Sequence, residues 1–205
     1  MFTPKILKLW TALLLILGLT ATSQAALIDR GSGLIYDTDF DITWLQDANY
    51  AKTSGYDADG AMNWSGAMTW ADGLVYGGYN DWRLPTSLNQ NGSGPCGPGY
   101  DCTGSEMGHL YYTELGNPAG GPLTNTGPFT NLQPYYWSGT DFSSGYAWAF
   151  YLSGGLQTGG PKGDGFYAWA VRPGDSAAVP EPGTLLLLGS GLAGMAAWRK
   201  RTGKR

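Results

Sequence analysis

Hydrophobic residues along this chain form two long, almost wholly apolar runs near the ends and several short alternating segments between them. The first run covers residues 9–19 and the second covers residues 185–198. Apolar runs of this length are typical of targeting segments that enter a membrane, whereas short alternating segments are typical of strands and helices with one buried face. The pattern therefore predicts a folded domain between two membrane-directed ends.

Short alternating segments in the central part of the chain predict β-strands. Residues 34–36 and 42–45 predict two strands joined as a hairpin at the start of the domain. Near its end, residues 146–152 and 167–172 alternate aromatic or branched side chains with smaller ones, and a Ser-Gly-Gly turn at 153–155 follows the first of them. We expect these segments to form an antiparallel sheet rich in aromatic residues.

Two helices are predicted between the hairpin and the later strands. Asn63 is a good N-cap for a helix that ends before Gly77 and Gly78, and Ser105 is a good N-cap for a shorter helix that ends at Gly116. The apolar face of the first helix comprises Trp64, Ala67, Met68, Ala71, Leu74 and Val75. The predicted fold class is therefore α+β, with an antiparallel sheet, two short helices and long loops.

Composition and charge limit the kind of domain and the kind of partner that are expected. The chain contains 33 glycines, 13 tyrosines and 9 tryptophans, which indicates a loop-rich domain with an aromatic core. Between residues 26 and 178 there are five basic and fifteen acidic side chains, a net charge of −10. Nucleic acid is excluded as a partner because no basic face can be assembled to neutralise phosphates. Cation binding is compatible with this charge.

The N-terminal segment has the three regions of a secretory signal peptide. Two lysines precede the first apolar run, and a Ser-Gln-Ala sequence follows it. We expect cleavage between Ala25 and Ala26, so that residues 1–25 are removed and residues 26–178 form an exported domain.

The C-terminal segment predicts a short membrane helix. Residues 184–198 carry no charge and would form a helix of roughly 22 Å, shorter than the ~30 Å hydrocarbon core of a bilayer. Five basic residues follow within 199–205, and basic flanks stay on the cytoplasmic side of a membrane. The preceding domain is therefore expected to be exported across the inner membrane.

The tail also resembles a known sorting signal. Val179-Pro180-Glu181-Pro182, a short apolar segment and a basic end at 199–201 are similar to the PEP-CTERM sorting signal, over residues 179–205. The resemblance implies a Gram-negative bacterium in which an exosortase recognises the tail after transient membrane anchoring. The enzyme then removes the tail and releases the protein to the cell surface or the extracellular (biofilm) matrix. The alternative is an ordinary single-pass anchor that is never cut.

A second resemblance covers about residues 30–174. The segments Trp44-Leu45-Gln46, 78–86, 136–140 and Val171-Arg172 resemble the Lcl C-terminal domain family, which includes part of a collagen-like bacterial adhesin. That family is related to the C-type-lectin and sulfatase-modifying folds, so the resemblance implies a C-type-lectin-like domain. Arg83 and Arg172 are expected to be structural, pairing with buried carboxylates or carbonyls and stacking on rings.

Three alternating carboxylates are the candidate metal ligands. Asp37, Asp39 and Asp41 occupy every second position, as in a calcium-binding loop. The glycine and glutamate that complete an EF-hand are missing, and a solvated turn is the alternative. His109 is the sole histidine of the chain, which excludes a catalytic triad and leaves open only a mixed site with carboxylates.

Cys96 and Cys102 are the only cysteines, and in an exported chain they are expected to form a disulfide. The alternative is a redox pair, because relatives with the sulfatase-modifying fold use cysteines to oxidise a substrate.

The function expected from the sequence is that of an exported, non-enzymatic binding module at the cell surface. The surplus of tryptophan and tyrosine favours extracellular polysaccharide as its partner, bound by loops at residues 89–100 and 117–131. No cofactor other than Ca²⁺ is expected. The alternatives are a sulfatase-modifying-type oxidase and a purely structural surface component.

Overall fold

A computed structural model describes residues 27–176 of the chain. The predicted signal peptide, its cleavage point at Ala25 and Ala26, and the tail at 179–205 with its apolar helix all lie outside these residues. Within residues 27–176, no helix combines the length and the apolar character needed to cross a membrane.

The first of two sheets joins the two ends of the described chain. Its strands are β1 (Leu27–Gly31), β2 (Leu34–Asp37), β3 (Ile42–Leu45) and β9 (Val171–Pro173), in the order β1-β2-β3-β9. Every neighbouring pair is antiparallel. The predicted hairpin at 34–45 is confirmed, since β2 and β3 pair with Leu34 opposite Leu45.

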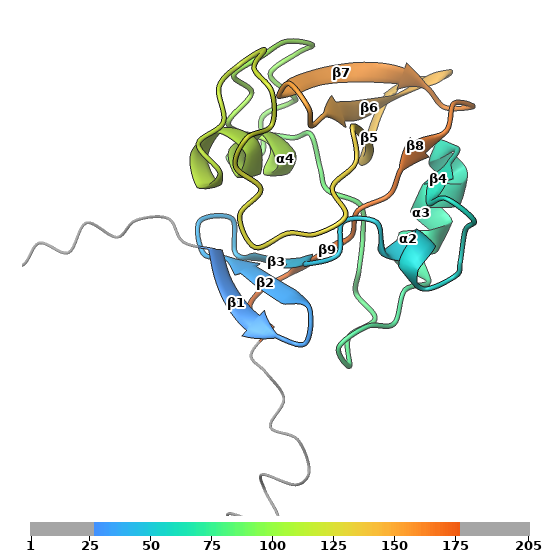
Figure 1. Ribbon diagram of the computed structural model, residues 1–205. Helices are drawn as coiled ribbons and strands as arrows, with labels where there is room; N and C mark the ends of the chain where they lie inside the picture. The colour runs from blue at the N-terminus through green and yellow to red at the C-terminus, as the bar shows by residue number, and fades with distance from the viewer. Residues whose placement is uncertain (1–26, 177–205) are drawn as a thin grey trace, which may run out of the picture.

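The second sheet contains five strands and lies across the molecule from the first (Figure 1). Its strands are β4 (Ala61–Met62), β5 (Tyr135–Ser143), β6 (Tyr146–Tyr151), β7 (Leu156–Pro161) and β8 (Phe166–Tyr167), in the order β4-β8-β5-β6-β7. Only the β5–β8 pair is parallel. The expectation of a single antiparallel sheet was therefore wrong, although most of the pairs are antiparallel.

The alternating segment at 167–172 does not form one strand. Tyr167 belongs to β8 in the second sheet and Val171 to β9 in the first, and the chain between them crosses from sheet to sheet. Ala168, Trp169 and Ala170 in this crossing are all fully buried. Because successive residues are buried, the large and small side chains of this segment pack on opposite sides of the chain, and both sides lie in the core.

Short helices flank the sheets, with α2 and α3 on one side and α4 on the other (Figure 1). They are α2 (Tyr50–Thr53), α3 (Trp64–Asp72), α4 (Glu106–His109) and the π-helix η1 (Leu110–Glu114). Asn63 and Ser105 are confirmed as N-caps, because their side chains accept hydrogen bonds from Gly66 N and Gly108 N.

The end of α3 differs from the prediction. The helix stops at Asp72, with Gly73 as its C-cap, several residues before Gly77. Val75, which we expected on the buried face, is 73% exposed.

The core is aromatic, as the composition indicates. Trp169 lies at its centre, with its ring centroid 4.7 Å from that of Trp44, 4.9 Å from that of Phe129 and 5.3 Å from that of Tyr136. Its indole Nε1 donates a hydrogen bond to the Leu45 carbonyl, at 2.8 Å. The domain is thus a sheet-rich mixed α/β fold around an aromatic core, and its likeness to C-type lectins stays a prediction.

Candidate functional site

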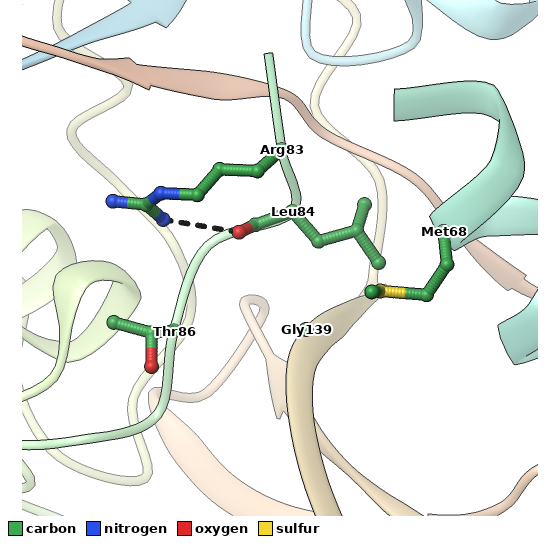
Figure 2. A pocket seen from close by; sticks show the side chains of 5 residues that line it. All are labelled: Met68, Arg83, Leu84, Thr86 and Gly139. Carbon is green, nitrogen blue, oxygen red and sulfur yellow. Dashed lines mark hydrogen bonds between the residues drawn. The ribbon is translucent and has the colours of Figure 1, made fainter. Parts of the chain in front are cut away.

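Two adjoining hollows lie along the segment after α3, and both are lined by Arg83 and Thr86. The first has a volume of about 370 Å³, and Figure 2 shows Met68 of α3 and the Leu84 side chain directed toward one another beside Gly139 of β5. The second has a volume of about 380 Å³. Its lining residues are Phe40, Asp41, Ile42, Arg83, Thr86, Leu88, Asn89, Gln90, Gly92, Glu106 and Pro173.

Arg83, which borders both hollows, is held by Glu106 at the start of α4. Its Nη1 and Nη2 donate to Glu106 Oε2 and Oε1 at 2.8 and 2.6 Å, and Nη1 also donates to the Leu84 carbonyl. The Glu106 side chain is buried, whereas the Arg83 side chain is 41% exposed. Burial opposes the charge of Arg83, but the hydrogen bonds and charge of Glu106 outweigh it and raise the pKa of the guanidinium. The pairing expected for Arg83 is confirmed.

Arg172 also pairs as expected. Its Nε and Nη2 donate to the two carboxylate oxygens of Asp81, at 2.8 and 2.9 Å, and its guanidinium lies 3.9 Å from the centroid of the Tyr79 ring. This pair lowers the pKa of Asp81. The Asp81 side chain is partly exposed, so its carboxylate is not the buried one that we expected.

The three aspartates of the predicted calcium loop have separate environments. Asp37 is fully buried, and its Oδ1 accepts hydrogen bonds from the backbone N–H groups of Asp39 and Phe40. Asp41 instead accepts a hydrogen bond from the Tyr36 hydroxyl.

The structure brings Asp37 to His109 and Glu114 instead. One ligand atom from each of these three residues lies within 4.8 Å of the others, and no second such group occurs among residues 27–176. His109 Nε2 lies 3.3 Å from Glu114 Oε1 and 3.6 Å from Asp39 Oδ2. Calcium binding at Asp37, Asp39 and Asp41 stays a prediction.

The two buried carboxyl groups of this cluster have raised pKa values. Burial is the largest cause for Asp37, and the hydrogen bonds from Phe40 and Asp39 and the charge of His109 oppose it. For Glu114, burial is again the largest cause, the charge of Asp37 adds to it, and the hydrogen bond to His109 opposes it. The cluster thus crowds several acidic groups into a poorly solvated space.

Cys96 and Cys102 form the expected disulfide, with their Cα atoms 5.8 Å apart. The loop that they close pairs with the edge of the second sheet, where Gly99 and Gln157 exchange backbone hydrogen bonds of 2.9 Å. The disulfide therefore holds a glycine-rich loop against β7.

Sequence reasoning located part of the hollows and missed other residues that line them. Asn89, Gln90 and Gly92 come from the first loop that we expected to bind a ligand, whereas the second loop, at 117–131, lines neither hollow. Met68 was assigned to the core, but it is 37% exposed. The hollows combine segments that are distant in the sequence, and of the two loops expected to bind a ligand only the one at 89–100 contributes to them.

A comparison with family models places a PEP-CTERM protein-sorting motif at residues 178–201. This match confirms the resemblance of the tail to that signal and indicates an exported, exosortase-sorted surface protein. None of the curated proteins compared with the chain matches it. Tail removal, the transient membrane anchor and the resemblance to the Lcl C-terminal domain stay predictions.

Proposed function

We propose that this exported protein is a non-enzymatic module that binds a carbohydrate polymer at the cell surface through the two hollows bordered by Arg83 and Thr86. The observation that carries this proposal is the combination of exposed apolar side chains with a fixed, partly exposed guanidinium in the same hollows. Met68 contributes to one hollow and Leu88, which is 41% exposed, contributes to the other.

This combination suits the surface of a sugar. A pyranose ring has apolar C–H faces and a rim of hydroxyl groups, so a matching site needs apolar contacts beside firmly held donors. Arg83 has five N–H groups, and its hydrogen bonds within residues 27–176 use three of them. The other two N–H groups are available to sugar oxygens. Two hollows that share a wall suit neighbouring units of a polymer.

The hydrogen bonds of the carboxylates in the second hollow support binding as its role, and not catalysis. Glu106 uses both oxygens in structural hydrogen bonds, to Arg83 and to the Thr86 backbone N–H. Asp41 accepts a hydrogen bond from Tyr36. Both groups thus serve as acceptors for the protein's own donors, which favours a binding role for the hollow.

The experiment is a glycan array probed with the fluorescently labelled full-length protein in mild detergent, followed by calorimetric titration with the strongest ligand. We expect a polysaccharide or oligosaccharide to bind with one site per chain. If no glycan binds, the proposal is wrong and the structural alternative is favoured. Oxidation of a cysteine-containing peptide by the same preparation would instead favour the sulfatase-modifying-type oxidase.

A further inference from the structure

The Asp37 carboxylate is buried, but only one of its two oxygens is hydrogen-bonded within residues 27–176. Asp37 is fully buried at the end of β2, and while Oδ1 accepts two backbone hydrogen bonds, Oδ2 has no hydrogen-bond partner among the described residues. The Trp44 indole N–H lies near this carboxylate, but it forms no hydrogen bond of ordinary geometry. An unpaired buried carboxylate oxygen is destabilising. A ligand that contacts Oδ2 would remove this cost.

The local helix geometry places two further candidate ligands, His109 and Glu114, close to Asp37. His109 ends α4, and Glu114 ends η1, in which Leu115 N donates to Leu110 O in the i→i+5 pattern of a π-helix. This wider turn brings residues five apart close to one another on a face, whereas an α-helix separates them. The imidazole Nε2 and Glu114 Oε1 consequently lie 3.3 Å apart, and the Glu114 side chain is only 2% exposed.

The charges of the cluster favour a cation. Asp37, Glu114 and the nearby Asp39 supply up to three negative charges, whereas His109 supplies at most one positive charge. These groups lie close together, with one ligand atom each from Asp37, His109 and Glu114 within 4.8 Å of one another. A divalent cation would balance this excess.

We propose that Asp37, His109 and Glu114 bind a first-row divalent transition metal ion of the zinc type, with Asp39 beside it. In a tetrahedral zinc site with bonds of about 2.0 Å, ligand atoms lie roughly 3.3 Å apart, close to the spacing of His109 and Glu114. Imidazole is a ligand for zinc and its neighbours, whereas calcium takes six to eight oxygen atoms. The Asp41 carboxylate, which accepts a hydrogen bond from the Tyr36 hydroxyl, is not a ligand in this proposal.

The site would fasten the β2–β3 turn to α4 and η1. Phe40, in that turn, packs on the His109 ring with a centroid distance of 4.4 Å and also lines the second hollow. Gln90, another lining residue, donates to the Asp39 carbonyl at 2.6 Å. A bound metal would therefore stiffen one wall of the hollow, yet the proposal does not depend on what the hollow binds.

The test uses untagged full-length protein in mild detergent, stripped with EDTA and titrated with ZnCl₂, MnCl₂ or CaCl₂. We expect one zinc ion per chain by mass spectrometry, and a rise in Tm of about 5 °C or more at a zinc concentration 100-fold above Kd. Calcium is expected to bind at least tenfold more weakly than zinc. If zinc produces neither stoichiometric binding nor a shift in Tm, the proposal is wrong.

Variants and a spectroscopic readout assign the site. Asp37→Asn and Glu114→Gln relieve the buried charge, so we expect stable proteins whose zinc affinity falls at least 100-fold, whereas Asp41→Asn in the same turn retains it. Because the chain has one histidine, its imidazole NMR signals report on this site in the unmodified protein even if a variant does not fold. Zinc is expected to shift these signals. Unchanged imidazole signals in the presence of zinc would overturn the assignment.

Discussion

Arg83 and Glu106 form a two-point ion pair that connects the segment after α3 to the first turn of α4. Glu106 Oε2 also accepts a hydrogen bond from the Thr86 backbone N–H at 2.8 Å. One carboxylate thus fixes the guanidinium and the backbone that border both hollows, so Glu106 is essential to their shape although its own side chain is buried.

Replacing Glu106 by Gln is expected to destabilise the domain by about 2 kcal/mol and to lower Tm by roughly 4–8 °C. The neutral amide weakens charge-assisted hydrogen bonds and leaves Arg83 without a counter-charge, and the partial exposure of Arg83 limits the cost. Thermal unfolding followed by near-ultraviolet circular dichroism measures this change.

Asp175→Asn is the matched control for this variant. It removes a two-point pair with Arg30 that lies outside the hollows, and the Asp175 side chain is more exposed than that of Glu106. We expect a loss below about 1 kcal/mol. Equal losses for the two variants would show that Glu106 has no special role in holding this region.

Leu88→Ala tests the apolar part of the proposed sugar site. Leu88 lines the second hollow and remains 41% exposed, so its truncation should leave the fold intact while removing contacts with a bound sugar ring. We expect glycan affinity to fall by roughly fivefold, equivalent to about 1 kcal/mol of lost apolar contact. Val75→Ala, at an exposed position that lines neither hollow, should bind as the unmodified protein does. Equal affinity of both variants would place the sugar elsewhere.

Local features of the fold could be predicted because the determining residues are neighbours in the sequence. Asn63 and Ser105 each cap a helix through a backbone N–H three residues ahead, and the β2–β3 hairpin follows from two alternating segments separated by a short turn. Such interactions can be predicted from neighbouring residues without knowing the rest of the structure.

Features that depend on distant contacts could not be predicted in the same way. The 167–172 segment has the period of one strand, but its two ends pair with different sheets. Asp37 and Glu114 lie far apart in the sequence, and Glu114 reaches His109 only through the π-helical turn. Nothing in the local composition distinguishes this turn from an α-helix, so the sequence offered the neighbouring aspartates as the more obvious ligands.

Removing the disulfide by a Cys96→Ser, Cys102→Ser double substitution is expected to destabilise the domain by about 2–3 kcal/mol. In the chain-entropy view, the disulfide closes a short loop and restricts the unfolded chain. The loop pairs with β7, and neither cysteine lines a hollow, so glycan affinity should remain unchanged. Calorimetry and denaturant unfolding of the same preparation separate the two effects. A loss of glycan binding at a temperature where the variant is folded would contradict this separation.

Asp81 is expected to contribute to the loss of stability in acid. Its folded-state pKa lies below the ordinary value of 3.8 because Arg172 donates two hydrogen bonds to its carboxylate. The unfolded chain therefore takes up a proton first, so the stability that the pair provides is complete above pH 3.8 and disappears as the pH falls through the lowered pKa. Asp81→Asn removes this contribution at every pH. The difference in unfolding free energy between the unmodified protein and the variant should be largest near neutral pH and should shrink below pH 3.8, as measured by urea unfolding. A difference that stays constant down to pH 2 would show that the Arg172 pair does not lower the pKa of Asp81.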